Sequence, residues 1–201
     1  MTDYFALLEM PRRPWLDPDS LKEKFLALSA KFHPDRLVGG DEVEKRVAHE
    51  RYIELNAAYN SLKNPKDRLS HLIRLEQGAS ASDLQTVPAT LMNVFMEVGE
   101  LCKMTDRFLS EKAAATSPLL KVQLFERGQE LSDQLAALQA RLGVAREELA
   151  KALKTLDEQW PRSWDEERRA LLGKLEEIRR LFGFFDRWIS QVQERFVQLA
   201  L

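Results

Sequence analysis

The residues of this chain best suited to chemistry are its three histidines, one of which begins the tripeptide His33-Pro34-Asp35. A histidine close to an aspartate could take part in acid–base catalysis, and histidines at regular spacing could bind a metal ion. The chain contains no glycine-rich phosphate-binding motif. His33, His49 and His71 lie on different predicted elements without ligand spacing, so a metal hydrolase built on them is a distant alternative. We therefore expect no catalytic site, no metal and no cofactor.

An amphipathic helix precedes the tripeptide. The apolar residues of the segment 21–32 step by four, three and four, which is the spacing of one helical face: Leu21, Phe25, Leu28 and Phe32. Asp17-Pro18 predicts the start of this helix, since the aspartate can accept from free backbone N–H groups and proline fits the first turn. Leu16 can pack on Leu21 as a hydrophobic staple. Because proline disfavours helical geometry at the residue before it, the chain must turn at His33.

A second helix is predicted from about Asp41 to Lys63. Its apolar stripe can close on the first helix and consists of Ala48, Tyr52, Leu55, Tyr59 and Leu62. Asn64-Pro65 ends this helix, and residues 69–75 predict a short further helix before Gly78. Residues 3–11 predict a short helix at the start of the chain, closed by Pro11. The predicted structure of residues 1–78 is thus an antiparallel helical hairpin with short flanking helices.

A helical hairpin with His-Pro-Asp at its tip resembles the J-domain family. The resemblance implies that this part of the chain stimulates ATP hydrolysis by a heat-shock chaperone of the DnaK class. It also implies that His33, Pro34 and Asp35 touch the chaperone. Basic residues on and just beyond the first hairpin helix are expected to meet an acidic surface of the chaperone: Lys22, Lys24, Lys31 and Arg36.

Composition limits the other classes of function. The chain has 201 residues, 44% of them hydrophobic, and a formal charge of −2, so it can build a core but has no global field for nucleic acid or membrane. Cys102 is the only cysteine, which excludes an internal disulfide and leaves a small buried residue as its expected role. The acidic start of the sequence lacks a secretory signal, and no apolar run is long enough to span a membrane. We expect a cytoplasmic protein.

Beyond residue 78 the sequence predicts a linker and then helices only. Residues 79–88 are small and polar and end at Pro88. Three helical segments follow, at about 89–114, 118–159 and 163–199. The last carries an unbroken seam at steps of four and three: Leu171, Leu175, Ile178, Phe182, Phe185, Ile189, Val192 and Phe196. The middle segment follows the same rule from Leu131 to Leu156. We therefore expect an all-α chain in which an elongated three-helix bundle over 89–201 follows the J-domain.

A J-domain followed directly by a helical bundle resembles the HscB family of co-chaperones of iron–sulfur cluster assembly. The local matches are Tyr4-Phe5, Trp15-Leu16-Asp17, Leu55 to Tyr59 with Leu62, Asn64-Pro65, Arg68 and Leu91-Met92. The resemblance implies two partners. One is a DnaK-class chaperone, usually the dedicated HscA, and the other is an IscU-like iron–sulfur scaffold protein, which the bundle delivers as client.

The first bundle helix has more apolar surface than a single core contact needs. Val94, Val98, Leu101, Thr105 and Phe108 make an ordinary core stripe. The surplus, Met92, Phe95 and Met96, predicts an exposed patch that Phe184 of the last helix could join, although neighbouring helices could instead bury both flanks. With Leu91, these residues are the expected client site. Where the family has acidic residues on this helix, an ungapped match places Met96, Gly99 and Lys103.

Two other functions stay open. The chain could be a J-protein with an unrelated client, which co-purification with a scaffold would distinguish. It could also be a structural helical protein whose His-Pro-Asp is accidental, in which case it would stimulate no DnaK-class ATPase.

Overall fold

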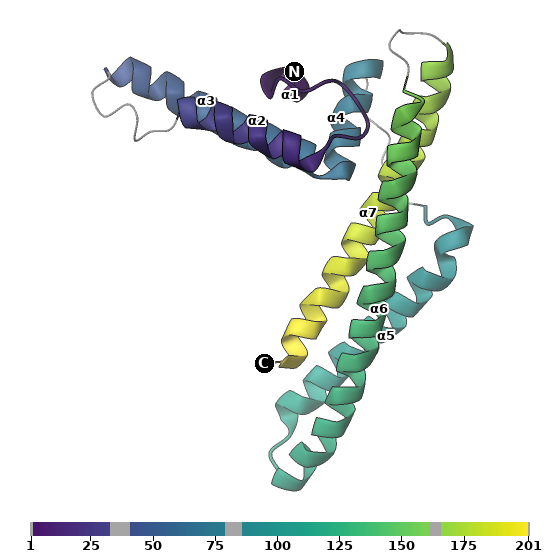
Figure 1. Cartoon of the computed structure of the whole chain (residues 1–201). Coiled ribbons are helices and arrows are strands. Elements are labelled where there is room, and N and C mark those ends of the chain that lie inside the picture. The colour runs from purple at the N-terminus through teal and green to yellow at the C-terminus, as the bar shows by residue number, and fades with distance from the viewer. Residues whose placement is uncertain (1, 33–40, 79–85, 161–165, 201) are drawn as a thin grey trace. The chain divides into compact units, whose positions relative to one another are not determined.

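The structure is a computed structural model that describes residues 2–32, 41–78, 86–160 and 166–200. These ranges contain seven α-helices, a short 3₁₀ helix and no strand (Figure 1). The helices are α1 (Tyr4–Leu7), α2 (Pro18–Lys31), α3 (Glu42–Lys63), α4 (Pro65–Gln77), η2 (Ala89–Leu91), α5 (Met92–Ala114), α6 (Pro118–Glu158) and α7 (Glu166–Ala200). The predicted all-α fold class is confirmed.

The chain forms two compact units that share its two longest helices. The first unit comprises Met1–Ser82 and Ala150–Arg180, and the second comprises Asp83–Leu149 and Leu181–Leu201. The end of α6 and the first half of α7 therefore belong with α1–α4, whereas the rest of both helices belongs with α5. The sequence limits of 1–78 for the J-domain, 79–88 for the linker and 89–201 for the bundle stay a prediction.

Side-chain caps set the helix boundaries of the first unit. Asp17 accepts a hydrogen bond from the backbone N–H of Ser20 at 2.9 Å and so starts α2 as predicted. Asp41 caps α3 by accepting from the N–H of Glu44 at 2.7 Å. Asn64 ends α3 and at once caps α4, whose first residue is Pro65, so α4 begins earlier than the short helix predicted at 69–75.

The core of the first unit joins α1, α2, α3 and α4. Among its deeply buried side chains are Phe5, Leu8, Leu21, Leu55, Leu62, Leu69, Leu72 and Ile73. The predicted faces of α2 and α3 meet in the stack of Phe25 on Tyr59, whose ring centroids are 4.3 Å apart. Leu16 is buried beside this core, in agreement with the predicted staple.

The core of the second unit joins α5, α6 and α7 (Figure 1). It contains the predicted stripes, among them Val98, Leu101 and Phe108 of α5, Leu135, Leu138 and Leu142 of α6, and Phe185 and Val192 of α7. Cys102 is 8% exposed within it, and burial raises the pKa of its thiol. The expectation of a small buried residue at this position is confirmed.

The predicted seam of α6 fails near the C-terminal end of this helix. Ala152 is exposed and Leu156 is half-buried, whereas Leu153 and Asp157, one residue further on, are buried. The reason is that Asp157 bonds to residues 13–15 of the first unit, so this end of α6 turns a different face inward. An apolar repeat cannot indicate a buried aspartate, and the prediction was wrong here.

Candidate functional site

The helical hairpin of α2 and α3 flanks the tripeptide. Lys31 ends α2, and Asp41 caps α3. His33, Pro34, Asp35 and Arg36 lie in the segment 33–40, outside the described residues. Their proposed role therefore stays a prediction, and the structure describes only the two helices that lead into and out of the segment.

The lysines predicted to face the chaperone are all exposed on α2. Lys24 is the one with a described partner, because its Nζ donates to Glu9 Oε2 at 2.8 Å. This hydrogen bond is the main reason why the pKa of Glu9 is lowered. Glu9 itself has a φ of 53°, a left-handed backbone conformation that few residues other than glycine adopt. The turn after α1 thus carries a carboxylate that pairs with Lys24.

Two buried polar residues of α4 hold the base of the hairpin. Arg68 is 5% exposed and donates from Nε to the carbonyl of Pro14 at 2.8 Å and from Nη1 to that of Leu62 at 2.7 Å. Burial lowers its pKa to about 10, with Asp157 acting in the opposite direction. His71 is 3% exposed and accepts a hydrogen bond from the backbone N–H of Tyr4 at 3.0 Å.

Asp157 connects the end of α6 to the segment between α1 and α2. Its carboxylate accepts from the backbone N–H of Trp15 at 3.1 Å and pairs with Arg13 at 2.8 Å. Arg13 also donates to the backbone carbonyl of Asp157 at 2.9 Å. Lys154 lies over the Trp15 ring at 4.7 Å from its centroid. No local pattern in the sequence indicates this cluster, because its partners are 142 and 144 residues apart.

A second ion pair, partly buried, connects the start of α7 to α4. Arg168 donates to Glu76 at 2.7 Å, with side-chain exposures of 13% and 6%. The Arg168 guanidinium also lies 4.8 Å from the centroid of the Trp160 ring. The two polar clusters thus join residues 13–15 and α4 to residues 150–180 inside the first unit.

The residues expected to bind the client divide between surface and core. Met92, Phe95 and Met96 are 43%, 42% and 52% exposed on α5, and Leu91 is half-buried beside them. Phe184 is only 7% exposed, so it is a core residue rather than part of the exposed patch. The predicted surplus of apolar surface on α5 is present in the structure.

Trp188 contacts both the exposed Phe95 and the buried Phe184. Its ring is 3% exposed and lies 6.4 Å from the ring centroid of Phe95 and 5.7 Å from that of Phe184. The sequence analysis missed Trp188, although its spacing of four from Phe184 indicates a second apolar stripe beside the main seam of α7. Trp188 is the support on which the exposed Phe95 rests.

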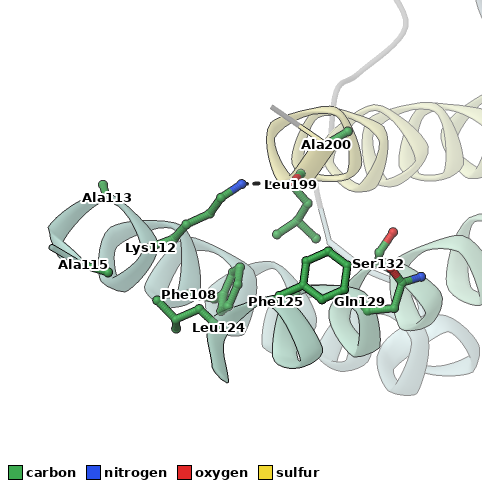
Figure 2. Close-up of a pocket in the computed structure, with 11 residues that line it drawn as sticks. Phe108, Lys112, Ala113, Ala115, Leu124, Phe125, Gln129, Ser132, Leu199 and Ala200 are labelled. Atoms are coloured by element: carbon green, nitrogen blue, oxygen red, sulfur yellow. Dashed lines mark hydrogen bonds between the residues drawn. The ribbon is translucent and has the colours of Figure 1, made fainter. Parts of the chain in front are cut away.

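The second unit also contains an open cavity of about 760 Å³, which none of the predicted site residues lines. Figure 2 shows Phe108 and Phe125 in its wall and the Lys112 Nζ next to the backbone carbonyl of Leu199, a contact of 3.4 Å. A Cβ added at Gly128 would lie 3.1 Å from Cζ of Phe108, so a larger residue there would crowd this wall.

The described residues contain no group of three or more metal-ligating side chains placed to hold an ion. His49 is exposed on α3, and His71 is buried against α1. Among the same residues, no helix is both long and apolar enough to cross a membrane.

The described residues combine a hairpin of α2 and α3 with a core formed by α5, α6 and α7 in one chain. No protein-family model matches the chain. The co-chaperone protein HscB of Proteus mirabilis is 34% identical over 88 residues, which are 44% of this chain. The match spans about half of that relative's length, 51%.

Solved structures of HscB proteins have the same fold. The chaperone HscB from Vibrio cholerae has a TM-score of 0.65 at 22% identity, over 98% of this chain and 99% of that one. The human co-chaperone protein HscB has a TM-score of 0.60 at 18% identity, over 98% of this chain and 81% of that one. The predicted resemblance to HscB-type co-chaperones is confirmed in sequence over part of the chain and in fold over nearly all of it. The names of these relatives describe chaperones and co-chaperones, not enzymes.

Proposed function

We propose that this protein is a cytoplasmic, non-enzymatic co-chaperone that stimulates ATP hydrolysis by a chaperone of the DnaK/HscA class. The observation that carries the proposal is the position of His33-Pro34-Asp35 between α2 and α3, two helices of a packed hairpin whose exposed face carries Lys22, Lys24 and Lys31. Exposed lysines would steer an acidic chaperone surface toward the tripeptide, so the association rate should fall as salt is added.

The second half of the proposal concerns the client. We propose that the apolar surface of α5, with Met92, Phe95 and Met96 exposed, binds an IscU-like iron–sulfur scaffold protein. Flexible methionine side chains adapt well to a partner, and a supported aromatic ring is a typical anchor of an interface. One chain that holds client and chaperone at once raises the effective concentration of each for the other.

An ATPase assay tests the chaperone half. His33→Gln or Asp35→Asn should abolish stimulation of a DnaK-class chaperone, while wild type stimulates it. The free energy of unfolding should change by less than about 0.5 kcal/mol, because the contacts of the hairpin core are made by α2, α3 and α4. Asp19→Asn on the exposed start of α2 is a matched control and should leave stimulation unchanged.

Two results would contradict the proposal. Equal stimulation by wild type and by His33→Gln would exclude the tripeptide as the contact site. Stimulation of no DnaK-class chaperone would favour a structural helical protein, whereas stimulation without binding to a scaffold would favour a J-protein with an unrelated client.

A further inference from the structure

The solvent-facing side of α5 changes its chemistry along its length. Residues at steps of four, three, four and four share one face of this helix and are all exposed: Met92, Met96, Gly99, Lys103 and Arg107. We name this set the α5 face. Its first part is apolar, its middle is a glycine, and its last part is cationic.

Three of the four acidic residues of α5 form ion pairs with arginines of the neighbouring helices. The pairs are Glu97 with Arg141 of α6, Asp106 with Arg195 of α7, and Glu111 with Arg127 of α6. Each carboxylate is therefore neutralised within the second unit and adds little negative potential to the surface.

The cations of the α5 face are not neutralised in this way. Lys103 and Arg107 are exposed and have no ion-pair partner within the described residues. Glu100, at the edge of the face, is the remaining acidic side chain of α5. The α5 face itself therefore carries net positive charge next to the exposed methionines.

Gly99 lacks a packing reason among the described residues. A Cβ added at Gly99 would meet no atom within 4 Å, and the residue lies in the interior of a helix of 23 residues. Glycine is less stable than alanine in a helix interior, so its presence costs stability and gains no contact with the described part of the chain. It does permit the backbone of a partner to approach α5 closely, between the methionines and the cations.

We propose that the α5 face binds a client segment whose apolar side chains are flanked by Asp and Glu, and that Gly99 is the point of closest approach. This deepens the proposed client-binding function and rests on it. The apolar side chains would cover Met92, Met96 and Phe95, while the carboxylates would meet Lys103 and Arg107. Charge complementarity of this kind selects partners and speeds their association more than it adds affinity.

Two synthetic helical peptides test the charge preference on the full-length chain. They share one apolar face, and one carries Glu and the other Lys on the flanking positions. Wild type should bind the Glu peptide about tenfold more tightly than the Lys peptide, and the difference should shrink at about 0.5 M salt, where exposed charges are screened. Lys103→Glu with Arg107→Glu should remove or reverse the preference, and the control Lys174→Glu, exposed on α7 within the first unit, should not change it.

A glycine pair tests the close approach. Gly99→Ala and Gly173→Ala both fill open space on a helix, so each should raise the melting temperature by about 2–4 °C. Only Gly99→Ala should also weaken binding of the Glu peptide, by about fivefold, because the added methyl group separates the two backbones.

Equal binding of both peptides, or tighter binding of the Lys peptide by wild type, would overturn the inference. Unchanged affinity in Gly99→Ala would overturn the role of the glycine. An ATPase assay without client, run on the same preparations, distinguishes failure of this inference from failure of the proposed co-chaperone function. Stimulation of the chaperone without a peptide preference would reject the inference alone, and a preference without stimulation would reject the co-chaperone function alone.

Discussion

His71 is the residue through which pH should act on this fold. Its imidazole is 3% exposed, stacks on Tyr4 at 4.5 Å between ring centroids, and accepts from the Tyr4 N–H. A nitrogen that accepts must be unprotonated, so the packed site requires neutral histidine. Burial lowers the pKa of His71, and Asp3 opposes this while Arg74 and Arg12 add to it.

The sign of the pH effect follows from this direction. A histidine whose pKa is lower in the folded state than the ordinary 6.5 binds its proton first in the unfolded chain. Stability is therefore fully present above about pH 6.5 and falls as the pH decreases below that value toward the folded pKa. Asp3, whose pKa lies below 3.8 when folded, affects stability only at more acidic pH.

Urea unfolding at about pH 7.5 and pH 5 measures the effect. Wild type should lose stability between these values, and His71→Gln, which keeps an acceptor for Tyr4 but does not titrate, should lose less. An equal loss in both proteins would assign the pH dependence to other groups.

The sequence predicted some of these residues and not others, for physical reasons. His33 was singled out because a proline and a helix end beside it are local signals. His71 could not be assigned a role, since its partner Tyr4 is 67 residues away in sequence. Phe184 could have joined the exposed patch or the core, because it lies off the main seam of α7, and the structure places it in the core, where it contacts Trp188.

At the scale of elements, capping and periodicity were good predictors where neighbours in sequence make the structure. Asp17, Asp41 and Asn64 cap the helices that they were expected to begin or end. The buried pattern near the end of α6 could not be predicted, because it depends on contacts with residues 13–15 rather than on an apolar repeat.

Asp157 should therefore contribute more to stability than its place in a charged helix indicates. Asp157→Ala removes the acceptor of the Trp15 N–H and leaves Arg13 without its carboxylate. We expect a loss of about 2 kcal/mol in the free energy of unfolding, since a buried donor loses its partner. Denaturant unfolding of the full chain measures it.

The adjacent Glu158 provides the control. It is exposed, so Glu158→Ala should change stability by less than about 0.5 kcal/mol. Hydrogen exchange adds a local readout: in Asp157→Ala the amide of Trp15 should exchange faster, whereas amides of α5 should not change. A loss of protection spread over all helices, or equal losses in the two variants, would contradict the proposed link.

For the whole molecule, the helices α6 and α7 run through both compact units. Domain limits predicted from a sequence are continuous ranges, so both helices were assigned to the predicted bundle over residues 89–201. In the structure their shared end contributes Asp157, Trp160 and Arg168 to the unit that holds α1–α4. Each unit therefore contains part of α6 and part of α7.

This arrangement predicts two binding activities that mutation can separate. Phe95 is the suitable probe of the client side, because it is 42% exposed and its ring rests on Trp188. Phe95→Ala should weaken scaffold binding by about 2 kcal/mol and leave stimulation of the chaperone without client unchanged. Phe184→Ala is the contrast: it should lose about 3 kcal/mol of stability, because it leaves a cavity in the core.

His33→Gln should show the opposite profile, with scaffold affinity retained and stimulation lost. We expect bound scaffold to increase stimulation through its raised effective concentration, and this increase should disappear in either variant, because each one breaks one half of the link. In a double variant the loss of scaffold affinity should equal that of Phe95→Ala alone, since His33 and Phe95 belong to different compact units. Calorimetric titration of the scaffold, with ATPase assays at matched concentrations, measures both quantities. Loss of scaffold binding in His33→Gln would show that the client also contacts the tripeptide, and the two activities would then not be separate.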